Sequence, residues 1–299
     1  MHPVVKSLRL RQWTKNMVLF AGLAFSGQAL EQEALLHAGM AFLAFCLGSS
    51  SVYLFNDILD RDRDRAHPVK RLRPIASGAL KVGAAIAIAI VLAAVAVTLS
   101  LPLGNALWAL LAYWVLQAFY TPWLKHVVLL DVFCIAAGFS LRVLAGVWAI
   151  DAPLSPWLVA CTVQLALFMA LCKRRAEAAS LDLSAGDDIA QRPTLGDYAS
   201  PATDMMIGVA AASTLVTYTL YTLLPAQVVN AGIPGLDSRA GEPGMVFTLP
   251  FVYFGVMRYL LLVYGRGRGE RPERIATMDP PTILAALGFA AVAGAVVYL

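Results

Sequence analysis

Asn56-Asp57-Ile58-Leu59-Asp60-Arg61-Asp62-Arg63-Asp64 closes a long apolar stretch of this chain with four carboxylates. At the helical repeat of about 100° per residue, Asn56, Asp57, Asp60 and Asp64 share one face, whereas Asp62 points away from it. Clustered carboxylates repel one another and lose hydration when buried, so they need a cation among them. Mg²⁺ suits this task, because it takes oxygen ligands and bridges to phosphate groups. We therefore predict that Asp57, Asp60 and Asp64 are metal ligands and catalytic residues assisted by Asn56; the competing interpretation is a solvated acidic helix end.

A basic stretch follows the aspartates directly. Lys70, Arg71 and Arg73 lie within nine residues of Asp64, and Pro74 and Gly78 come next. Ligands for a metal beside cationic groups for phosphate are what a site that handles diphosphates needs. We predict that Lys70, Arg71 and Arg73 bind phosphate.

The composition is that of a membrane protein. The chain is 59% hydrophobic and only 14% charged, with a mean hydropathy of +0.69, which exceeds what a soluble domain shows. We predict an all-α integral membrane protein, one domain over residues 1–299, with nine transmembrane helices in a bundle. The predicted spans are 16–30, 34–56, 82–101, 104–121, 128–149, 154–172, 203–224, 245–264 and 281–299. The four cysteines all fall in these spans, at spacings that fit neither zinc nor a disulfide framework.

The positive charges predict the orientation in the membrane. Every Lys and Arg outside the predicted spans, except Arg239, falls on the side of the N-terminus. By the positive-inside rule, the N-terminus is cytoplasmic and the C-terminus lies outside the cell (inner) membrane. In a bundle, the polar ends of spans 34–56, 104–121, 154–172 and 245–264 would then meet around a cytoplasm-facing cavity.

Two further polar groups lie at predicted cytoplasmic helix ends. Tyr120 and Lys125 flank Thr121-Pro122, where a helix must end, and both side chains can donate to a diphosphate. The alternative is an interfacial aromatic ring and a snorkelling lysine. Lys173, Arg174 and Glu177 share one helical face and predict a basic phosphate pocket, or else an anchor at the membrane edge. The aspartates that follow are predicted to be solvated loop charges; they are Asp182, Asp187, Asp188 and Asp197.

Arg142 lies inside the predicted span 128–149, where an unpaired charge would cost about 2.5 kcal/mol or more. Asp131 is on the same face but about 16 Å away along the axis, which is too far for a direct pair. Arg142 therefore either reaches a substrate phosphate in the cavity or pairs with a group on another helix.

Several of these motifs together resemble the UbiA superfamily of intramembrane prenyltransferases. The first is Asn56-Asp57-x-x-Asp60-x-x-x-Asp64, followed by Arg73-Pro74-x-x-x-Gly78. The resemblance is closer to the branch of decaprenyl-phosphate phosphoribosyltransferases. The residues that carry it are Arg11-Gln12-Trp13-x-Lys15-Asn16, Asp64-Arg65-x-His67-Pro68-x-Lys70-Arg71, Tyr120-x-x-x-x-Lys125, Lys173-Arg174-x-x-Glu177 and Arg258-Tyr259. Prenyl-transferring relatives carry a second motif, D-x-x-x-D, where this chain has Lys173 and Glu177.

The resemblance implies a nine-helix fold with a central cavity, and Mg²⁺-dependent transfer of 5-phosphoribosyl from phosphoribosyl diphosphate to a polyprenyl (decaprenyl) phosphate, a cell-wall precursor. The implied partners are these two substrates in the membrane, with no nucleic acid. The predicted substrate-binding residues are Asn56, Lys15, Lys70, Arg71, Arg73, Tyr120, Lys125, Arg142, Lys173, Arg174 and Glu177. One alternative is prenyl transfer from a polyprenyl diphosphate to an aromatic acceptor, which would need a second acidic motif. Another is a transporter or lipid-binding protein without chemistry.

Overall fold

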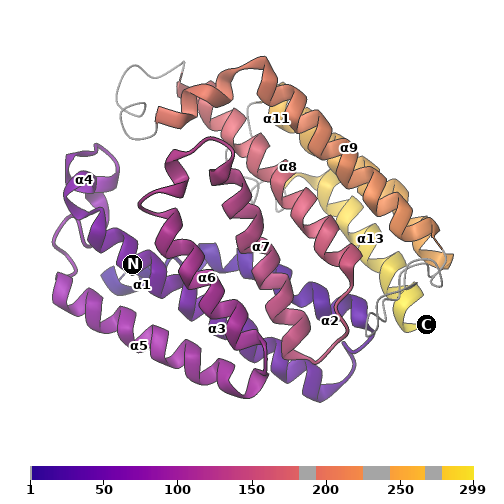
Figure 1. Ribbon diagram of the computed structural model, residues 1–299, viewed down its shortest axis with the longest axis horizontal. Coiled ribbons are helices and arrows are strands. Elements are labelled where there is room, and N and C mark those ends of the chain that lie inside the picture. Colours follow the sequence, from indigo (N-terminus) through magenta and orange to yellow (C-terminus); the bar gives the residue numbers. More distant parts are fainter. Residues whose placement is uncertain (1, 182–192, 225–242, 267–277) are drawn as a thin grey trace. The chain divides into compact units, whose positions relative to one another are not determined.

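The computed structural model describes residues 2–181, 193–224, 243–266 and 278–299, and every regular element in these ranges is a helix (Figure 1). The chain divides into two compact units. Unit 1 comprises Met1–Ala24, Gln28–Thr121 and Leu141–Ala152, and unit 2 comprises Phe25–Gly27, Pro122–Ser140 and Pro153–Leu299. The first half of helix α7 (Leu130–Ala149) belongs to unit 2, and its second half belongs to unit 1. The all-α class predicted from the sequence is confirmed for the described residues.

Unit 1 is built around a long helix that ends in the aspartates. Its elements are α1 (Pro3–Leu8), the 3₁₀ helix η1 (Leu10–Leu19), most of α2 (Phe20–Ser26), α3 (Gln32–Leu59), α4 (Arg61–Ala66), η2 (Lys70–Leu72), α5 (Val82–Ser100), η3 (Leu101–Leu103) and α6 (Ala106–Tyr120). Helices α3 and α5 pack along each other (Figure 1). One buried cluster joins Leu19, Phe45, Leu110 and Tyr113 to alanines of α3, α5, α6 and α7, so η1, α3, α5, α6 and the end of α7 share a core.

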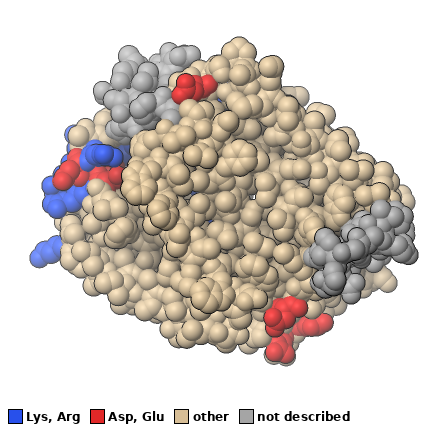
Figure 2. All heavy atoms as spheres, in the orientation of Figure 1, with Lys and Arg blue, Asp and Glu red and all other residues tan. Residues whose placement is uncertain are grey.

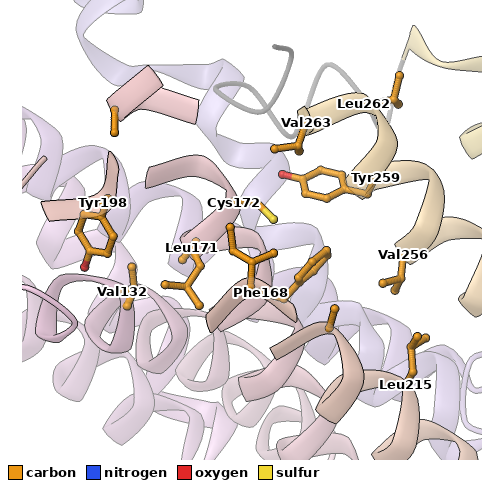
Figure 3. Close-up of a cluster of buried hydrophobic side chains, with 14 residues drawn as sticks. Val132, Phe168, Leu171, Cys172, Tyr198, Leu215, Val256, Tyr259, Leu262 and Val263 are labelled. Atoms are coloured by element: carbon orange, nitrogen blue, oxygen red, sulfur yellow. The ribbon is translucent and has the colours of Figure 1, made fainter. Parts of the chain in front are cut away.

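Unit 2 has its own core. Its elements are η4 (Leu124–His126), the first half of α7, α8 (Pro156–Leu181), η6 (Pro193–Ala199), α9 (Pro201–Leu223), η7 (Pro243–Thr248), α11 (Leu249–Arg266) and α13 (Pro280–Tyr298). Proline is the first residue of α8, α9 and α13. At this position its missing N–H breaks no helical hydrogen bond. Figure 3 shows Phe168 of α8 and Tyr259 of α11 in the core, with ring centroids 5.5 Å apart in an edge-on arrangement.

Seven of the described helices are long and apolar enough to cross a membrane. They are Gln32–Leu59, Val82–Leu103, Leu130–Ala149, Pro156–Ala179, Pro201–Leu223, Gly244–Gly265 and Pro280–Tyr298. These confirm seven of the predicted spans. The predicted span 104–121 is the shorter apolar helix α6, whose 15 residues extend about 22 Å at about 1.5 Å per residue, less than the ~30 Å hydrocarbon layer. The predicted span 16–30 is divided between η1 and α2, neither of which reaches that length.

Gly146 of α7 brings two segments of unit 1 into backbone contact. A Cβ atom on Gly146 would lie 1.9 Å from the carbonyl oxygen of Leu19, at the end of η1. One turn earlier on α7, Arg142 donates from Nε to Oδ1 of Asn16 at 2.7 Å. Asn16 in turn donates to Sγ of Cys46 on α3 at 3.3 Å. The missing side chain at Gly146 therefore permits a buried polar link between η1, α3 and α7.

We expect Gly146→Ala to lower the free energy of unfolding by roughly 1–3 kcal/mol, because the new methyl group collides with backbone that cannot move aside like a side chain. Thermal unfolding of the detergent-purified protein would measure this. Gly39→Ala on α3 is the matched control, since a Cβ there meets nothing within 4 Å. Equal melting temperatures for the two variants would contradict the close approach.

Candidate active site

The aspartates lie at the junction of α3 and α4 in unit 1. Helix α3 ends at Leu59, and Asp60 joins it to α4. The amide of Asp60 donates to the carbonyl of Asn56 at 2.9 Å, and the amide of Asp64 donates to the carbonyl of Asp60 at 2.8 Å. Helical hydrogen bonding therefore crosses the junction. Asp57 and Asp64 are buried, at 3% and 4% exposure, whereas the Asp62 side chain is 91% exposed, as the helical spacing predicts.

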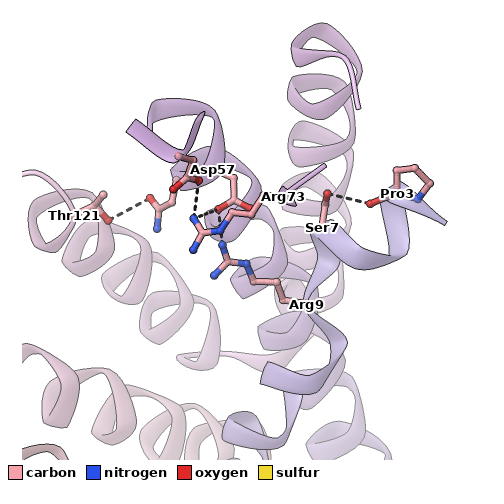
Figure 4. Close-up of polar contacts among 8 residues, drawn as sticks. Pro3, Ser7, Arg9, Asp57, Arg73 and Thr121 are labelled. Carbon is pink, nitrogen blue, oxygen red and sulfur yellow. Dashed lines mark hydrogen bonds and ion pairs between the residues drawn. The ribbon is translucent and has the colours of Figure 1, made fainter. Parts of the chain in front are cut away.

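Arg73 bridges the two buried carboxylates. Its Nη1 lies 2.7 Å from Oδ2 of Asp64 and 3.2 Å from Oδ1 of Asp57. Figure 4 shows Arg9 reaching Asp57 from the N-terminal segment, where the two form a second ion pair. The guanidinium of Arg9 also lies over the ring of Tyr53, 5.0 Å from its centroid. Two carboxylates and two guanidinium groups thus form one connected, charge-balanced cluster, which we call the Asp57–Asp64 cluster.

The turn that follows η2 carries Arg73 to this place. Gly78 adopts a positive φ of 80°, a conformation in which a side chain would be strained. The amide of Leu80 donates to the carbonyl of Pro74 at 2.9 Å, and Ile75 and Leu80 pack in a buried cluster with Leu54 of α3. The apolar packing beneath Arg73 lowers the local dielectric, which strengthens its ion pairs and raises the cost of leaving either carboxylate unpaired.

The donor atoms of the Asp57–Asp64 cluster fit Mg²⁺ in chemistry, because the metal prefers carboxylate oxygens. Within the described residues, no group of three His, Cys, Asp or Glu side chains is arranged so that it could hold a metal ion. Asp57 and Asp64 are a pair of candidate ligands with Arg73 between them, and Asp60 lies half-buried at the helix junction. Asn56 accepts a hydrogen bond from Thr121 at the end of α6, at 3.2 Å. The metal roles of the three aspartates stay a prediction.

Arg9 was not among the predicted site residues. Arg9 belongs to none of the motifs that carry the family resemblance, and its 48-residue distance from Asp57 along the chain gave no signal. The residue occupies a left-handed conformation between α1 and η1, with φ 52° and ψ 48°. The segment is fixed on both sides of it. Trp13 Nε1 donates to Oγ of Ser50 at 3.0 Å, and Lys6 Nζ donates to the carbonyl of Leu72 at 3.0 Å.

A second polar cluster lies in unit 2. Arg174 of α8 donates from Nε to Oδ2 of Asp131 at 2.6 Å and pairs through Nη1 with Glu177. Tyr198 of η6 donates to Asp131 and accepts from the amide of Leu129 at 2.9 Å. Arg174 is only 3% exposed, and Asp131 and Tyr198 are buried too. Burial, and then the carboxylate of Asp131, raise the pKa of Tyr198 well above its usual range.

Arg174 and Glu177 were predicted to share one face of a helix, but Asp131 and Tyr198 were not predicted to be partners of Arg174 and Asp131, respectively. Arg142 belongs to a different set of contacts. Arg142 is buried in unit 1, bonded to Asn16, with its guanidinium 4.6 Å from the centroid of the Tyr113 ring.

The other predicted residues are spread over both units. Lys15 is half-buried in η1; Lys70 is half-buried and Arg71 exposed in η2. Tyr120 ends α6 in unit 1, and Lys125 lies in η4 of unit 2. Lys173 is 3.7 Å from Glu177 and its side chain is 36% exposed. Asp197 is exposed, as expected of a loop charge; the other three loop aspartates (Asp182, Asp187 and Asp188) and Arg239 lie outside the described residues.

Arg258 of α11 forms a separate ion pair in unit 2. It contacts both carboxylate oxygens of Asp279, at 3.1 and 2.9 Å. Hydrogen bonding from Arg258 holds the pKa of Asp279 well below its usual range. Asp279 also accepts from the amide of Thr282 and so caps α13. Arg258 lies inside the predicted span 245–264, and the structure shows it in a structural ion pair.

Charged atoms are sparse on the face drawn in Figure 2. Most of the Lys and Arg atoms visible there lie beside Asp and Glu atoms near α4, further acidic atoms lie elsewhere on this face, and most of the drawn surface carries neither. Such a surface suits contact with lipid, interrupted by the exposed charged residues of α4.

Comparisons with known proteins place this architecture in a family. The model of the UbiA prenyltransferase family matches residues 17–273. The decaprenyl-phosphate phosphoribosyltransferase of Mycolicibacterium smegmatis is 34% identical over 300 residues, which cover 99% of this chain and 92% of that protein. The protein of the same name from Mycobacterium tuberculosis is 33% identical, covering 98% and 94%. The structure of a UbiA homolog from Archaeoglobus fulgidus bound to GPP and Mg²⁺ superposes with a TM-score of 0.71, at 20% identity, over 99% of each chain.

This chain belongs to the UbiA prenyltransferase family. It is a multi-pass membrane protein and a transferase, which confirms the resemblance drawn from its motifs. Its nearly full-length similarity to decaprenyl-phosphate phosphoribosyltransferases includes both units.

Substitution of Asp60 tests the predicted role in metal binding without removing an ion pair that stabilises the fold. Asp57→Ala and Asp64→Ala remove partners of buried or half-buried arginines, so we expect them to lose activity and some stability together. Asp60→Ala should lower the transfer rate at least about a hundredfold, the size of effect seen when one charge-stabilising group is removed, and leave the melting temperature unchanged. Asp62→Ala is the matched control and should stay within about threefold of the parent rate. Equal losses for Asp60→Ala and Asp62→Ala would exclude Asp60 as a ligand.

Asp131 holds the polar cluster of unit 2 together. We expect Asp131→Asn to lower the free energy of unfolding by roughly 3–5 kcal/mol, because it leaves the buried Arg174 with one carboxylate fewer. Tyr198→Phe should cost about 1.5–3 kcal/mol, the contribution of a hydrogen bond to a charged group. Asp197→Asn, on the exposed side of η6, should change nothing. Thermal or denaturant unfolding measures all three, and a silent Asp131→Asn would show that the cluster does not stabilise the fold.

Proposed function

We propose that this protein transfers the 5-phosphoribosyl group of phosphoribosyl diphosphate to a polyprenyl phosphate, with decaprenyl phosphate as the expected acceptor. The observation that carries the proposal is the pairing of the buried Asp57 and Asp64 with Arg73 in unit 1, where acidic and cationic groups for a metal–diphosphate complex are already together. By the resemblance drawn from the sequence, Lys173 and Glu177 stand where prenyl-transferring relatives carry their second acidic motif. The relatives named decaprenyl-phosphate phosphoribosyltransferase, at 33–34% identity, support the same choice.

The proposed reaction exchanges one bond at the anomeric carbon of the ribose. An oxygen of the lipid phosphate forms a bond to this carbon while its bond to the diphosphate oxygen breaks, and inorganic diphosphate leaves with the electron pair. Negative charge grows on the leaving diphosphate in the transition state, so groups that bind it there accelerate the reaction.

Asp57, Asp60 and Asp64 would hold Mg²⁺, with Asn56 assisting. When bound, the metal supplies positive charge to the leaving diphosphate; the Archaeoglobus fulgidus homolog was solved with Mg²⁺. Arg73, with Lys70 and Arg71 of the preceding η2, would bind the phosphate oxygens. Bidentate guanidinium groups are well matched to this task.

Lys173 is the residue of unit 2 that suits the 5-phosphate of the ribose. Arg174 is buried between Asp131 and Glu177, so we infer that it orders this helix end, whereas the Lys173 ammonium is partly exposed beside Glu177. The remaining proposed contacts to substrate are those of Lys15, Tyr120, Lys125 and Arg142. The bundle would carry the isoprenoid tail of the acceptor beside a cytoplasm-facing cavity, within one nine-helix domain.

The proposed orientation places the N-terminus in the cytoplasm of the cell and the C-terminus outside the inner membrane, by the bias of positive charges. The expected result is that a reporter fused after Leu299 is active only outside the cytoplasm. A cytoplasmic reporter signal at that position would overturn the orientation and the count of nine spans together.

The experiment that tests the function uses purified protein with radiolabelled phosphoribosyl diphosphate. We expect label to enter the lipid fraction only when both Mg²⁺ and polyprenyl phosphate are present. Transfer of a prenyl group to an aromatic acid, without use of phosphoribosyl diphosphate, would favour the aromatic prenyltransferase instead. Binding of polyprenyl phosphate with neither reaction would favour a lipid-binding protein.

Inhibition by two compounds distinguishes contacts to the 5-phosphate of the donor from contacts to its diphosphate. We expect Lys173→Ala to raise the KM for phosphoribosyl diphosphate about tenfold, which corresponds to about 1.4 kcal/mol and is what one charge-assisted contact contributes. The same variant should weaken inhibition by ribose 5-phosphate by a similar factor, while inhibition by inorganic diphosphate stays unchanged. Weaker inhibition by both compounds would show that Lys173 does not select the 5-phosphate.

A further inference from the structure

Arg9 and Arg73 neutralise the two buried carboxylates of the Asp57–Asp64 cluster. Arg73 contacts both carboxylates, and Arg9 pairs with Asp57. The four formal charges sum to zero. The aspartate side chains are buried, whereas the side chains of Arg9 and Arg73 are 30% and 31% exposed. The guanidinium groups thus lie on the outer side of the carboxylates, where an arriving ion would meet them.

This arrangement affects a bare cation and an anionic donor in opposite ways. A divalent cation approaching alone finds Asp57 and Asp64 with their charge already balanced, so that Asp60 is the one proposed ligand left to attract it, and it is repelled by two guanidinium groups close by. A donor that carries a diphosphate is attracted by the same groups. When cation and donor bind together, the carboxylates bind the metal. The guanidinium groups then pair with the negative charge of the diphosphate instead.

We propose that Arg9 is an internal counter-ion that keeps a divalent metal from binding alone and thereby couples metal binding to binding of the diphosphate donor. The inference rests on the proposed function in one respect only, namely that the Asp57–Asp64 cluster is the metal–diphosphate site. Arg9 is better placed for this role than Arg73, because it comes from a different segment of the chain and can leave Asp57 without dissolving the bridge to Asp64.

The N-terminal segment is built so that Arg9 returns to the same position. Bonds on either side of Arg9 attach the segment to α3 and η2, through Trp13 to Ser50 and through Lys6 to Leu72. The aromatic ring of Tyr53 supports the guanidinium from α3. A displaced Arg9 side chain would therefore move while its backbone stays in place, which is what a reversible counter-ion requires.

The test measures metal binding without turnover. Mn²⁺, which takes the same oxygen ligands as Mg²⁺, is titrated into purified protein, and the free ion is followed by electron paramagnetic resonance, with and without inorganic diphosphate. We expect the parent protein to bind Mn²⁺ weakly alone and at least about tenfold more tightly with diphosphate. Arg9→Gln should tighten binding of Mn²⁺ alone about tenfold and leave binding in the presence of diphosphate unchanged. The coupling, which is the ratio of the two dissociation constants, then falls by the same factor.

Two matched variants separate charge from folding. Arg9→Lys keeps the positive charge and should bind Mn²⁺ alone as weakly as the parent. Arg63→Gln removes one exposed positive charge from α4 and should also leave Mn²⁺ binding within about threefold of the parent. Unchanged or weaker binding of Mn²⁺ alone by Arg9→Gln would overturn the inference, as would equal tightening by Arg9→Lys or Arg63→Gln.

The proposed function can fail separately. If Arg9→Gln shifts Mn²⁺ binding as expected but no phosphoribosyl transfer is found, the counter-ion role stands and the substrate assignment falls. If neither the parent nor Arg9→Gln binds Mn²⁺, with or without diphosphate, the cluster is not a metal site and both proposals fall.

Discussion

A charge that is removed from water needs an opposite charge within reach, and unit 1 is organised around this requirement at Asp57 and Asp64. Arg73 satisfies both carboxylates at once. Several features of the unit serve that contact: the left-handed glycine at residue 78, the buried Ile75 beneath the turn, and the N-terminal segment that delivers Arg9. Because breaking such a pair leaves an uncompensated buried charge, the position of each of these segments is tied to the others.

The same requirement is met in other ways elsewhere in the chain. Asp131 is shared between a guanidinium and a phenol in unit 2. Arg142 is held by the amide oxygen of Asn16 and by the face of the Tyr113 ring. Arg258 and Asp279 use one bidentate pair that also begins a helix. Most of these contacts join segments that are distant in sequence. The polar groups therefore help to specify which helices are neighbours. Apolar side chains discriminate less between neighbours, because lipid tails are as apolar as they are.

Local rules predicted what depends on short stretches of sequence. Hydropathy identified seven spans, and the helical repeat separated Asp62 from Asp57 and Asp64 because backbone hydrogen bonds continue through Asp60. The same rules failed where the result depends on long-range packing. Residues 16–30 read as a span, yet η1 is a 3₁₀ helix fixed by Asn16 and by the approach of Gly146, neither of which hydropathy registers. Arg9 and Asp131 were overlooked as partners because their contacts lie 48 and 43 residues away along the chain.

The sequence positions of the Asp57–Asp64 cluster also bear on how the protein is made. Arg9, Asp57, Asp64 and Arg73 all belong to the first quarter of the chain, and chains generally fold from the N-terminus as they are synthesised. The two carboxylates can therefore meet their arginines before most of the later helices have been synthesised. If Arg9 and Arg73 neutralise Asp57 and Asp64 at this stage, the end of α3 can enter the membrane boundary without two uncompensated negative charges. The arginines that balance the finished site would then also assist insertion of the protein.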